Sequence, residues 1–418
     1  MTDAAKLHSE RRDKMNGKRI GQQTIELPSR PALCGSAAFV GRKEGEGPLG
    51  HCFDQVAKDE MYGQESFELA ERQLYLDAIA AAVQKGRERM EDIQFLLGGD
   101  LLNQIITASF SARDLGIPFI GLYGACSTMS ESLCLAGMLL DGGHARQVIC
   151  AASSHFCTAE RQYRYPLEFG SQRPPTAQWT VTGAGATLLC AEPKVPPLAR
   201  MERVCMGRVV DLGIADANNM GAAMAPAAAD TLLSLFRDTQ TGPEDYDAIV
   251  TGDLGQVGHD LLMQLMREQR LPLMDERYHD CGLMIFDREK QDVHAGGSGC
   301  GCSASVLNGY FLPKLQTGEL GMDPEVDTTM EALRDFMFER VYKNPVAKGE
   351  EVKARHILQE LYTYYIKHPE ALPADFQPQL SFDGMERTVC DYIAGMTDKY
   401  AMYKYDELFI PLAWQVRG

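Results

Sequence analysis

One cysteine occupies a position typical of a nucleophile. Cys126 follows the hydrophobic run IPFIGLY and a Gly-Ala turn, and it precedes a helical stretch. The N-terminus of a helix supplies partial positive charge and N–H groups, which lower a thiol pKa and can hold an oxyanion. The position indicates either covalent chemistry at Cys126, with Ser127 beside it in a ligand site, or small residues that pack a turn.

A catalytic cysteine needs a base or a charged partner. His155, just past a strand in SSHF, is the nearest candidate by topology, and His259 and His294 flank corresponding loops later in the chain. Each of the three has the alternative of being a surface histidine.

Two aspartates end matched hydrophobic runs. Asp100 and Asp253 each stand in a Gly-Asp-Leu segment, where α/β proteins place ligand-binding groups. Their alternative role is to cap the next helix. The glycine-rich stretch 294–299, which includes Gly297 and Ser298, would let the backbone approach a ligand closely.

Arginines and aromatic residues gather in the stretch ERQYRYPLEFGSQRPP. Arg161, Arg164 and Arg173 lie in this segment. Such a cluster suits an aromatic or carboxylate anion. A salt-bridged structural loop is the alternative.

These residues are carried by alternating strands and helices. The runs ALCGSAAFV, IQFLLGGD, IPFIGLYG, RQVICAASS and TGAGATLLCAE predict strands, and helices over 65–86 and 131–143 lie between them. Alternation of this kind predicts an α/β fold with mixed sheets covered by helices.

The pattern then repeats. EDIQFLLGGDL at 91–101 reappears as EDYDAIVTGDL at 244–254, and the Cys-Ser segment at 126–127 has an echo at 302–303. Two matches in the same order predict two related halves. After the second Cys-Ser helix no equivalent strands follow, so we expect the second half to be truncated and its sheet to keep an open edge.

The composition changes near residue 320. Of the 39 glycines, 34 come before residue 321, whereas 14 of the 34 aromatic residues fall in the last 98. Three helices are expected in this tail, over 322–342, 350–373 and 385–409, with Met, Leu and aromatic residues at helical spacing. We therefore expect an all-α tail after an α/β part.

Composition also excludes several classes of protein. No run of about 18 apolar residues is present to cross a membrane, and the first residues lack the apolar segment of a secretory signal. A net charge of −17 argues against nucleic-acid binding. The 12 cysteines show no disulfide framework, which fits a reducing compartment. Cys300 and Cys302 are too close to indicate a metal pair, and no metal or cofactor is expected.

The segments EGPLGHCFD, GGDLLNQ, GACSTMSES, SSHFCTAERQYRYPLEFG, TGDLGQVG, HDCGLMIFD and AGGSGCGCSA together resemble the stage V sporulation protein AD family, from about residue 17 to 320. The resemblance implies a thiolase-like fold of two similar α/β halves. It also implies binding of dipicolinic acid, an aromatic dianion, during its uptake into the developing spore, together with partner proteins at the inner spore membrane.

The resemblance implies departures from working thiolases too. Cys126 takes the place of the acyl-accepting cysteine. Gly252-Asp253-Leu254-Gly255 stands where thiolases carry Asn-Glu-Ala-Phe, and Gly296-Gly297-Ser298 stands where they carry Gly-His-Pro. The base needed for acyl condensation is out of register. We expect a binding protein on an enzyme scaffold, with acyl transfer through Cys126 as the alternative.

The tail resembles a different family. LRDFMFERVYKNP, LYTYYIKHPEALP and CDYIAGMTDKYA are similar to the C-terminal end of deoxyguanosine triphosphate triphosphohydrolase-like proteins of the HD superfamily. The metal site of that superfamily lies upstream of this segment. The dipeptide His279-Asp280 belongs to the other part, and His356 and His368 stand alone, so no triphosphohydrolase activity is expected. Tyr392 and Asp398 belong to the family-like segment.

The resulting prediction is a fusion of a truncated sporulation thiolase-like protein with the tail of an HD hydrolase, in four segments of chain. They are a disordered extension at 1–16, a thiolase-like N-terminal half at 17–195, a truncated C-terminal half at 196–320, and a helical segment of HD-hydrolase type at 321–418. The tail is expected to be an interaction module or a remnant of the hydrolase. We expect a protein peripheral to the inner membrane of the forespore, with dipicolinic acid and other uptake proteins as partners and with a homodimer as one arrangement. Ligand contacts are assigned to Asp100, Cys126, Ser127, His155, Arg161, Arg164, Asp253, Gly297 and Ser298.

Overall fold

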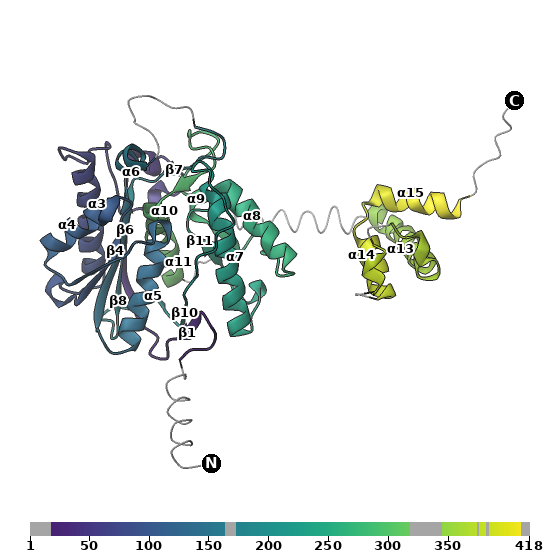
Figure 1. The fold of residues 1–418 in the computed structure, drawn as a ribbon, viewed down its shortest axis with the longest axis horizontal. Helices are drawn as coiled ribbons and strands as arrows, with labels where there is room; N and C mark the ends of the chain where they lie inside the picture. Colours follow the sequence, from purple (N-terminus) through teal and green to yellow (C-terminus); the bar gives the residue numbers. More distant parts are fainter. Residues whose placement is uncertain (1–17, 164–172, 318–344, 374–375, 382–383, 411–418) are drawn as a thin grey trace, which may run out of the picture. The chain divides into compact units, whose positions relative to one another are not determined.

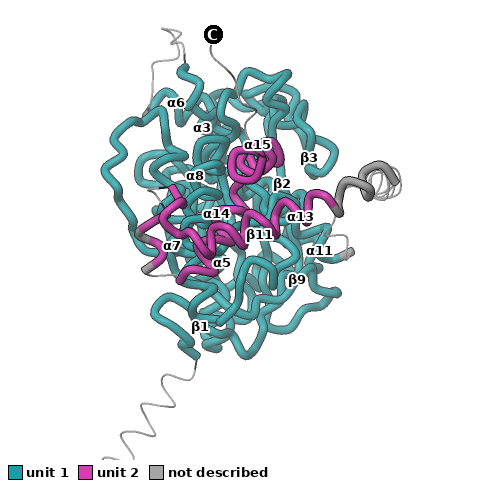
Figure 2. The backbone as a smooth tube through the Cα atoms, turned by 90° about the vertical axis from the view of Figure 1, so that its right-hand side faces the viewer, with its two compact units in different colours: residues 1–320 teal, residues 321–418 magenta. Residues whose placement is uncertain are grey.

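A computed structural model describes residues 18–163, 173–317, 345–373, 376–381 and 384–410. The chain divides into two compact units, Met1–Leu320 and Gly321–Gly418 (Figure 2). The expected extension at 1–16, Arg164 and the expected helix at 322–342 lie outside the described residues. The division of the first unit into halves at residue 195 stays a prediction.

The centre of the first unit is a seven-stranded mixed sheet (Figure 1). Its order is β3-β2-β8-β6-β4-β5, with β9 also paired to β2. Strand β8 runs antiparallel to both β2 and β6, whereas β4 is parallel to both β6 and β5. The strands are β2 (Ala32–Val40), β3 (Gln55–Val56), β4 (Phe95–Gly99), β5 (Phe119–Gly121), β6 (Gln147–Ser154), β8 (Gly183–Cys190) and β9 (Ala199–Arg200).

Helices cover both faces of this sheet. Alternate residues point to opposite faces, so that Leu96 and Ile149 pack under α3 (Phe67–Lys85) and α4 (Ile106–Leu115). Leu97 and Val148 pack under α5 (Thr128–Asp141) and α10 (Cys300–Val306) on the other face. The strands and helices expected in this half are confirmed.

Helix α10 of the second half is part of the core of the first. A Cβ at Gly185 on β8 would lie 2.2 Å from the carbonyl oxygen of Ala304. Only glycine allows the helix this close to the sheet. A π-helical turn at Leu307–Phe311 and α11 (Leu312–Thr317) continue α10.

The second half has much less sheet. Two parallel strands, β11 (Ile249–Thr251) and β12 (Tyr278–Asp280), form a pair of their own. Up to residue 317, no strand of the described chain follows β13 (Gly297–Ser298), and the truncation of the second half stays a prediction. The remaining elements are β1 (Thr24–Glu26), α2 (Arg42–Gly45), α6 (Phe156–Tyr163), β7 (Trp179–Thr180), β10 (Arg203–Cys205), α7 (Met220–Thr239), α8 (Gly255–Glu268), α9 (Cys281–Met284) and β13 (Gly297–Ser298).

The second unit is helical, as expected. Its core joins α13 (Pro345–Lys367), α14 (Met385–Ala394) and α15 (Asp398–Phe409) through Leu361, Tyr365, Val389, Tyr392 and Ala401. The prediction of a single helix over 385–409 was wrong. The chain breaks at Gly395, and the Thr397 hydroxyl accepts the N–H of Tyr400 to begin α15.

Candidate functional site

Cys126 lies in a short 3₁₀ turn, Ala125–Ser127, that leads directly into α5. Its thiol hydrogen-bonds the buried carboxyl of Asp253, which comes from the other half of the unit. Its carbonyl accepts the hydroxyl of Ser303 at 3.4 Å. The Ser127 hydroxyl turns back to the carbonyl of Gly124 at 2.9 Å. The turn is therefore held from both sides by elements distant in sequence.

Asp253 is the centre of the site. Its Oδ2 accepts the N–H of Gly299 at 2.7 Å, and Ser298 also hydrogen-bonds its carboxyl. Burial raises the pKa of Asp253 to about 6, against the lowering effect of these hydrogen bonds and of Cys126. The structure thus joins Cys126, Asp253 and Ser298 from the predicted site.

Strand β13 brings the glycine-rich stretch into place. Gly297 pairs with Trp179 and Ser298 with Thr180 on β7, in parallel. Gly299 begins α10 with a φ of +94°, a conformation that suits glycine. This conformation turns its N–H toward Asp253.

Asp100 forms a different arrangement. Its two carboxyl oxygens accept the N–H groups of Leu102 and Ala108, both at 2.8 Å. Burial raises the pKa of Asp100 to about 6. Nearby Glu71 is fully buried and accepts the hydroxyls of Ser153 and Thr158, and burial, followed by the charge of Asp100, raises its pKa to about 8.

His155 is committed to other contacts. Its Nδ1 accepts the N–H of Cys157 at 3.1 Å, so Nε2 carries the proton and donates to the carbonyl of Glu60 at 2.8 Å. Burial lowers the pKa of His155 and keeps the ring neutral. Both nitrogens are thus engaged away from Cys126, which leaves the predicted base without its expected role.

The arginine cluster is only partly described. Arg161 lies in helix α6, which continues to Tyr163. It pairs with Glu68 at 3.5 Å and lies over the ring of Phe67. Arg173 lies elsewhere, beside Trp179 and Asp292.

The remaining histidines make local contacts. His259 bonds Asp260 at 3.1 Å and stacks on Tyr278. His294 lies 3.4 Å from Asp292, and His368 lies 3.2 Å from Glu370.

The thiols of Cys300 and Cys302 point to different acceptors. Cys300 donates to the carbonyl of Ser153 at 2.8 Å and Cys302 to that of Gly252 at 3.8 Å. Burial keeps the pKa of both thiols well above the ordinary value. They are structural side chains, in contrast to the partly exposed Cys126.

Sequence reasoning missed Asp280. Its carboxyl accepts the N–H groups of Leu254 and Gly255, each at 2.9 Å, and the hydroxyl of Thr251 at 2.7 Å. The residues before it, Asp275–His279, are mostly charged or polar, so no hydrophobic signal in the sequence marked the strand that Asp280 ends. Glu71 was missed because a single glutamate in an amphipathic helix looks solvent-exposed.

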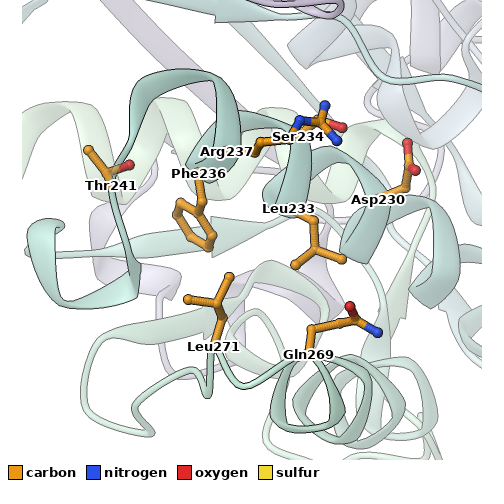
Figure 3. Close-up of a pocket in the computed structure, with 8 residues that line it drawn as sticks. All are labelled: Asp230, Leu233, Ser234, Phe236, Arg237, Thr241, Gln269 and Leu271. Atoms are coloured by element: carbon orange, nitrogen blue, oxygen red, sulfur yellow. The ribbon is translucent and has the colours of Figure 1, made fainter.

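A cavity of about 420 Å³ lies apart from these residues, at the ends of α7 and α8 (Figure 3). Leu233, Phe236 and Leu271 face one another across it. Its charged residues have partners, since Asp230 binds Arg208 and Arg237 binds Asp238. None of the predicted site residues lines this cavity.

The chain has distant neighbours among solved structures, at TM-scores below 0.5. Solved structures with a similar arrangement include a 3-oxoacyl-[acyl-carrier-protein] synthase III from Aquifex aeolicus VF5, at 12% identity and a TM-score of 0.42, which covers 69% of this chain and 92% of that one. Cerulenin-bound OleA of Xanthomonas campestris is similar at 13% identity and a TM-score of 0.44, over 72% of this chain and 90% of that one. This likeness concerns the fold alone.

The chain belongs to the Stage V sporulation protein AD family, whose model matches residues 21–323. Stage V sporulation protein AD of Bacillus subtilis (strain 168) is 45% identical over 305 residues, 72% of this chain and 88% of that protein. The chain is thus a member of a sporulation protein family. Among the residues the model describes, no helix has the length and apolar character needed to span a bilayer.

The tail matches a second model, the phosphohydrolase-associated domain, over residues 320–407. A deoxyguanosinetriphosphate triphosphohydrolase-like protein of Caldanaerobacter subterraneus subsp. tengcongensis is 42% identical over 96 residues. One from Clostridium tetani is 35% identical over 98 residues. These matches cover 23% of this chain and 28% of each relative.

Proposed function

We propose that the chain binds dipicolinic acid and takes part in its uptake into the developing spore. The observation that carries this proposal is family membership, with 45% identity across 88% of the Bacillus subtilis relative. The family resemblance implies the ligand, and the site is assigned to the surroundings of Cys126 and Asp253.

Binding suits these surroundings better than catalysis. Acyl transfer needs a base beside the thiol, and the imidazole of His155 is engaged with Glu60 and Cys157. Asp253 hydrogen-bonds this thiol, but its pKa of about 6 lies below the ordinary thiol pKa of about 8.5, so the proton stays mostly on Cys126. When protonated, the same carboxyl donates a hydrogen bond to a ligand carboxylate, which is a binding role.

Calorimetry with dipicolinate and the full chain tests the proposal. We expect saturable binding that is at least tenfold tighter than for isophthalate, which has the same two carboxylates but no ring nitrogen. Circular dichroism first establishes that the protein is folded. Folded protein that gives no binding signal with dipicolinate would contradict the proposal.

The second candidate is acyl transfer through Cys126. It is favoured by one observation, the position of a partly exposed thiol in the turn that begins α5. Iodoacetamide labelling combined with an acyl-CoA turnover assay tests it. Turnover that disappears in Cys126→Ala would favour an enzyme over a pure binding protein.

We further propose a peripheral place at the inner forespore membrane, reached through other uptake proteins, with a homodimer as one form. For the tail we propose an interaction module without triphosphohydrolase activity, because it covers only 28% of its hydrolase relatives. Fractionation of sporulating cells, with and without residues 321–418, tests both statements. Loss of membrane association on removal of the tail would identify the tail as the attachment.

A further inference from the structure

Two cations share one aromatic ring at the edge of the first unit. The Nζ of Lys43, in α2, lies 3.3 Å from the ring centroid of Trp179, and the Cζ of Arg173 lies 4.6 Å from it. Phe156 stacks on the same indole, with centroids 3.7 Å apart and an interplanar angle of 3°. The ring therefore fixes the position of both positive charges.

The two cations repel each other, and the carboxyls of Asp292, Glu44 and Glu60 offset part of this repulsion at Lys43. Burial, then the charge of Arg173, lowers the pKa of Lys43. The carbonyl of Asp292 accepts hydrogen bonds from both side chains at 3.0 Å. Its carboxylate lies 3.2 Å from Arg173 but is 75% exposed, so it is a screened counterion.

One donor of Arg173 has no acceptor. The Arg173 side chain is only 12% exposed, and its Nη1 is buried without a hydrogen-bond partner. A buried donor of this kind costs about 1–3 kcal/mol. An incoming oxyanion would satisfy it and would relieve the repulsion between the two cations.

This cluster is connected to the Cys126 site. Trp179 pairs with Gly297 across the β7–β13 ribbon, and the next residue along, Ser298, hydrogen-bonds Asp253. The strand that carries Trp179 is therefore paired directly with the strand that carries Ser298.

We propose that Lys43 and Arg173, held on the ring of Trp179, form a binding site for a carboxylate of a planar aromatic acid. One carboxylate oxygen accepts from Nη1 of Arg173, and the other pairs with the Lys43 ammonium. The choice of dipicolinate as the acid rests on the proposed function, whereas the carboxylate site does not.

Tryptophan fluorescence gives a direct test, because the chain has only two tryptophans, Trp179 and Trp414. In Trp414→Phe the remaining emission reports on the ring that Lys43 covers. Excitation at the red edge of the indole band avoids absorption by the ligand. We expect a saturable change with dipicolinate, and at least tenfold weaker binding after Lys43→Met or Arg173→Gln.

Arg113→Gln is the matched control, since Arg113 lies over Phe110 and not over Trp179; it should bind within twofold of the parent. Unchanged affinity in both Lys43→Met and Arg173→Gln would overturn the site, even if calorimetry shows that dipicolinate binds. Equal affinity for inorganic phosphate would overturn the assignment to a carboxylate. If dipicolinate fails but benzoate titrates the signal in a Lys43-dependent way, the site stands and the proposed function falls.

Discussion

The two Gly-Asp-Leu segments of the first unit show the same sequence in two different roles. In the first half, Asp100 binds N–H groups of its own loop and of α4, at Leu102 and Ala108. In the second half, Asp253 leaves its own segment and binds the N–H of Gly299 and the thiol of Cys126. One aspartate closes a local turn, and the other joins distant elements.

Asp280 makes this difference possible. From the end of β12, the carboxyl of Asp280 accepts the N–H groups of Leu254 and Gly255. In the second half, Asp280 therefore makes the local contacts that Asp100 makes in the first half. Each half thus places two carboxyls close together, Asp100 with Glu71 and Asp253 with Asp280. Because Asp280 makes these local contacts, the carboxyl of Asp253 is available to bind the N–H of Gly299 and the thiol of Cys126.

The largest expected effect is at Asp280. Asp280→Ala would leave the N–H groups of Leu254, Gly255 and Leu283 without this acceptor, at a cost of about 3–5 kcal/mol. Asp100→Ala should cost about half as much, because it loses two bonds and relieves repulsion with Glu71. Urea denaturation measures both. Equal losses would contradict the division of roles between Asp253 and Asp280.

Gly299→Ala tests the turn that presents an N–H to Asp253. The new Cβ would lie 3.0 Å from both Leu101 Cδ1 and Ser154 Oγ, at a φ of +94°. We expect a loss of about 2 kcal/mol from strain. Gly252→Ala, whose Cβ would meet Ser303 at 3.3 Å, is the milder control. Thermal unfolding of the two variants compares them, and an equal shift would argue against strain at Gly299.

The carboxyl pair of the first half predicts a pH dependence. Glu71 has a pKa of about 8 in the folded chain against an ordinary value of 4.5, so the folded state holds the extra proton between these values. Stability then falls as the pH rises from about 4.5 to about 8. Glu71→Gln, which stays neutral, should flatten this slope and gain most above pH 8. Stability curves that run parallel for the two proteins would refute the assignment.

The smallest expected effect concerns Cys126. Cys126→Ala removes one hydrogen bond to Asp253 and should cost about 1 kcal/mol or less. Because that bond lowers the pKa of Asp253, its loss should move the pKa upward. Carboxyl NMR titration measures the change, with Cys126→Ser as the control that keeps a donor. An unmoved Asp253 would show that the thiol does not act on it.

Much of the fold follows from the sequence because its strands are apolar runs bounded by glycine. The expected ALCGSAAFV strand is β2, Gly86 caps α3, and the echo of EDIQFLLGGDL is β11. The tail was harder, because the break at Gly395 depends on the Thr397 cap more than on hydrophobic spacing. Part of the site was also visible, since Cys126, Asp253 and Ser298 do meet.

The sequence by itself determined the alternation of strands and helices in the first unit, the helical character of the tail, and the family. It did so because periodicity, glycine turns and motifs are local properties of the chain. Only the tertiary structure decided that His155 faces Glu60, that Asp280 takes over the local contacts, and that Lys43 and Arg173 meet on Trp179. Such contacts depend on how distant strands and helices pack, and burial then sets the charge of each group.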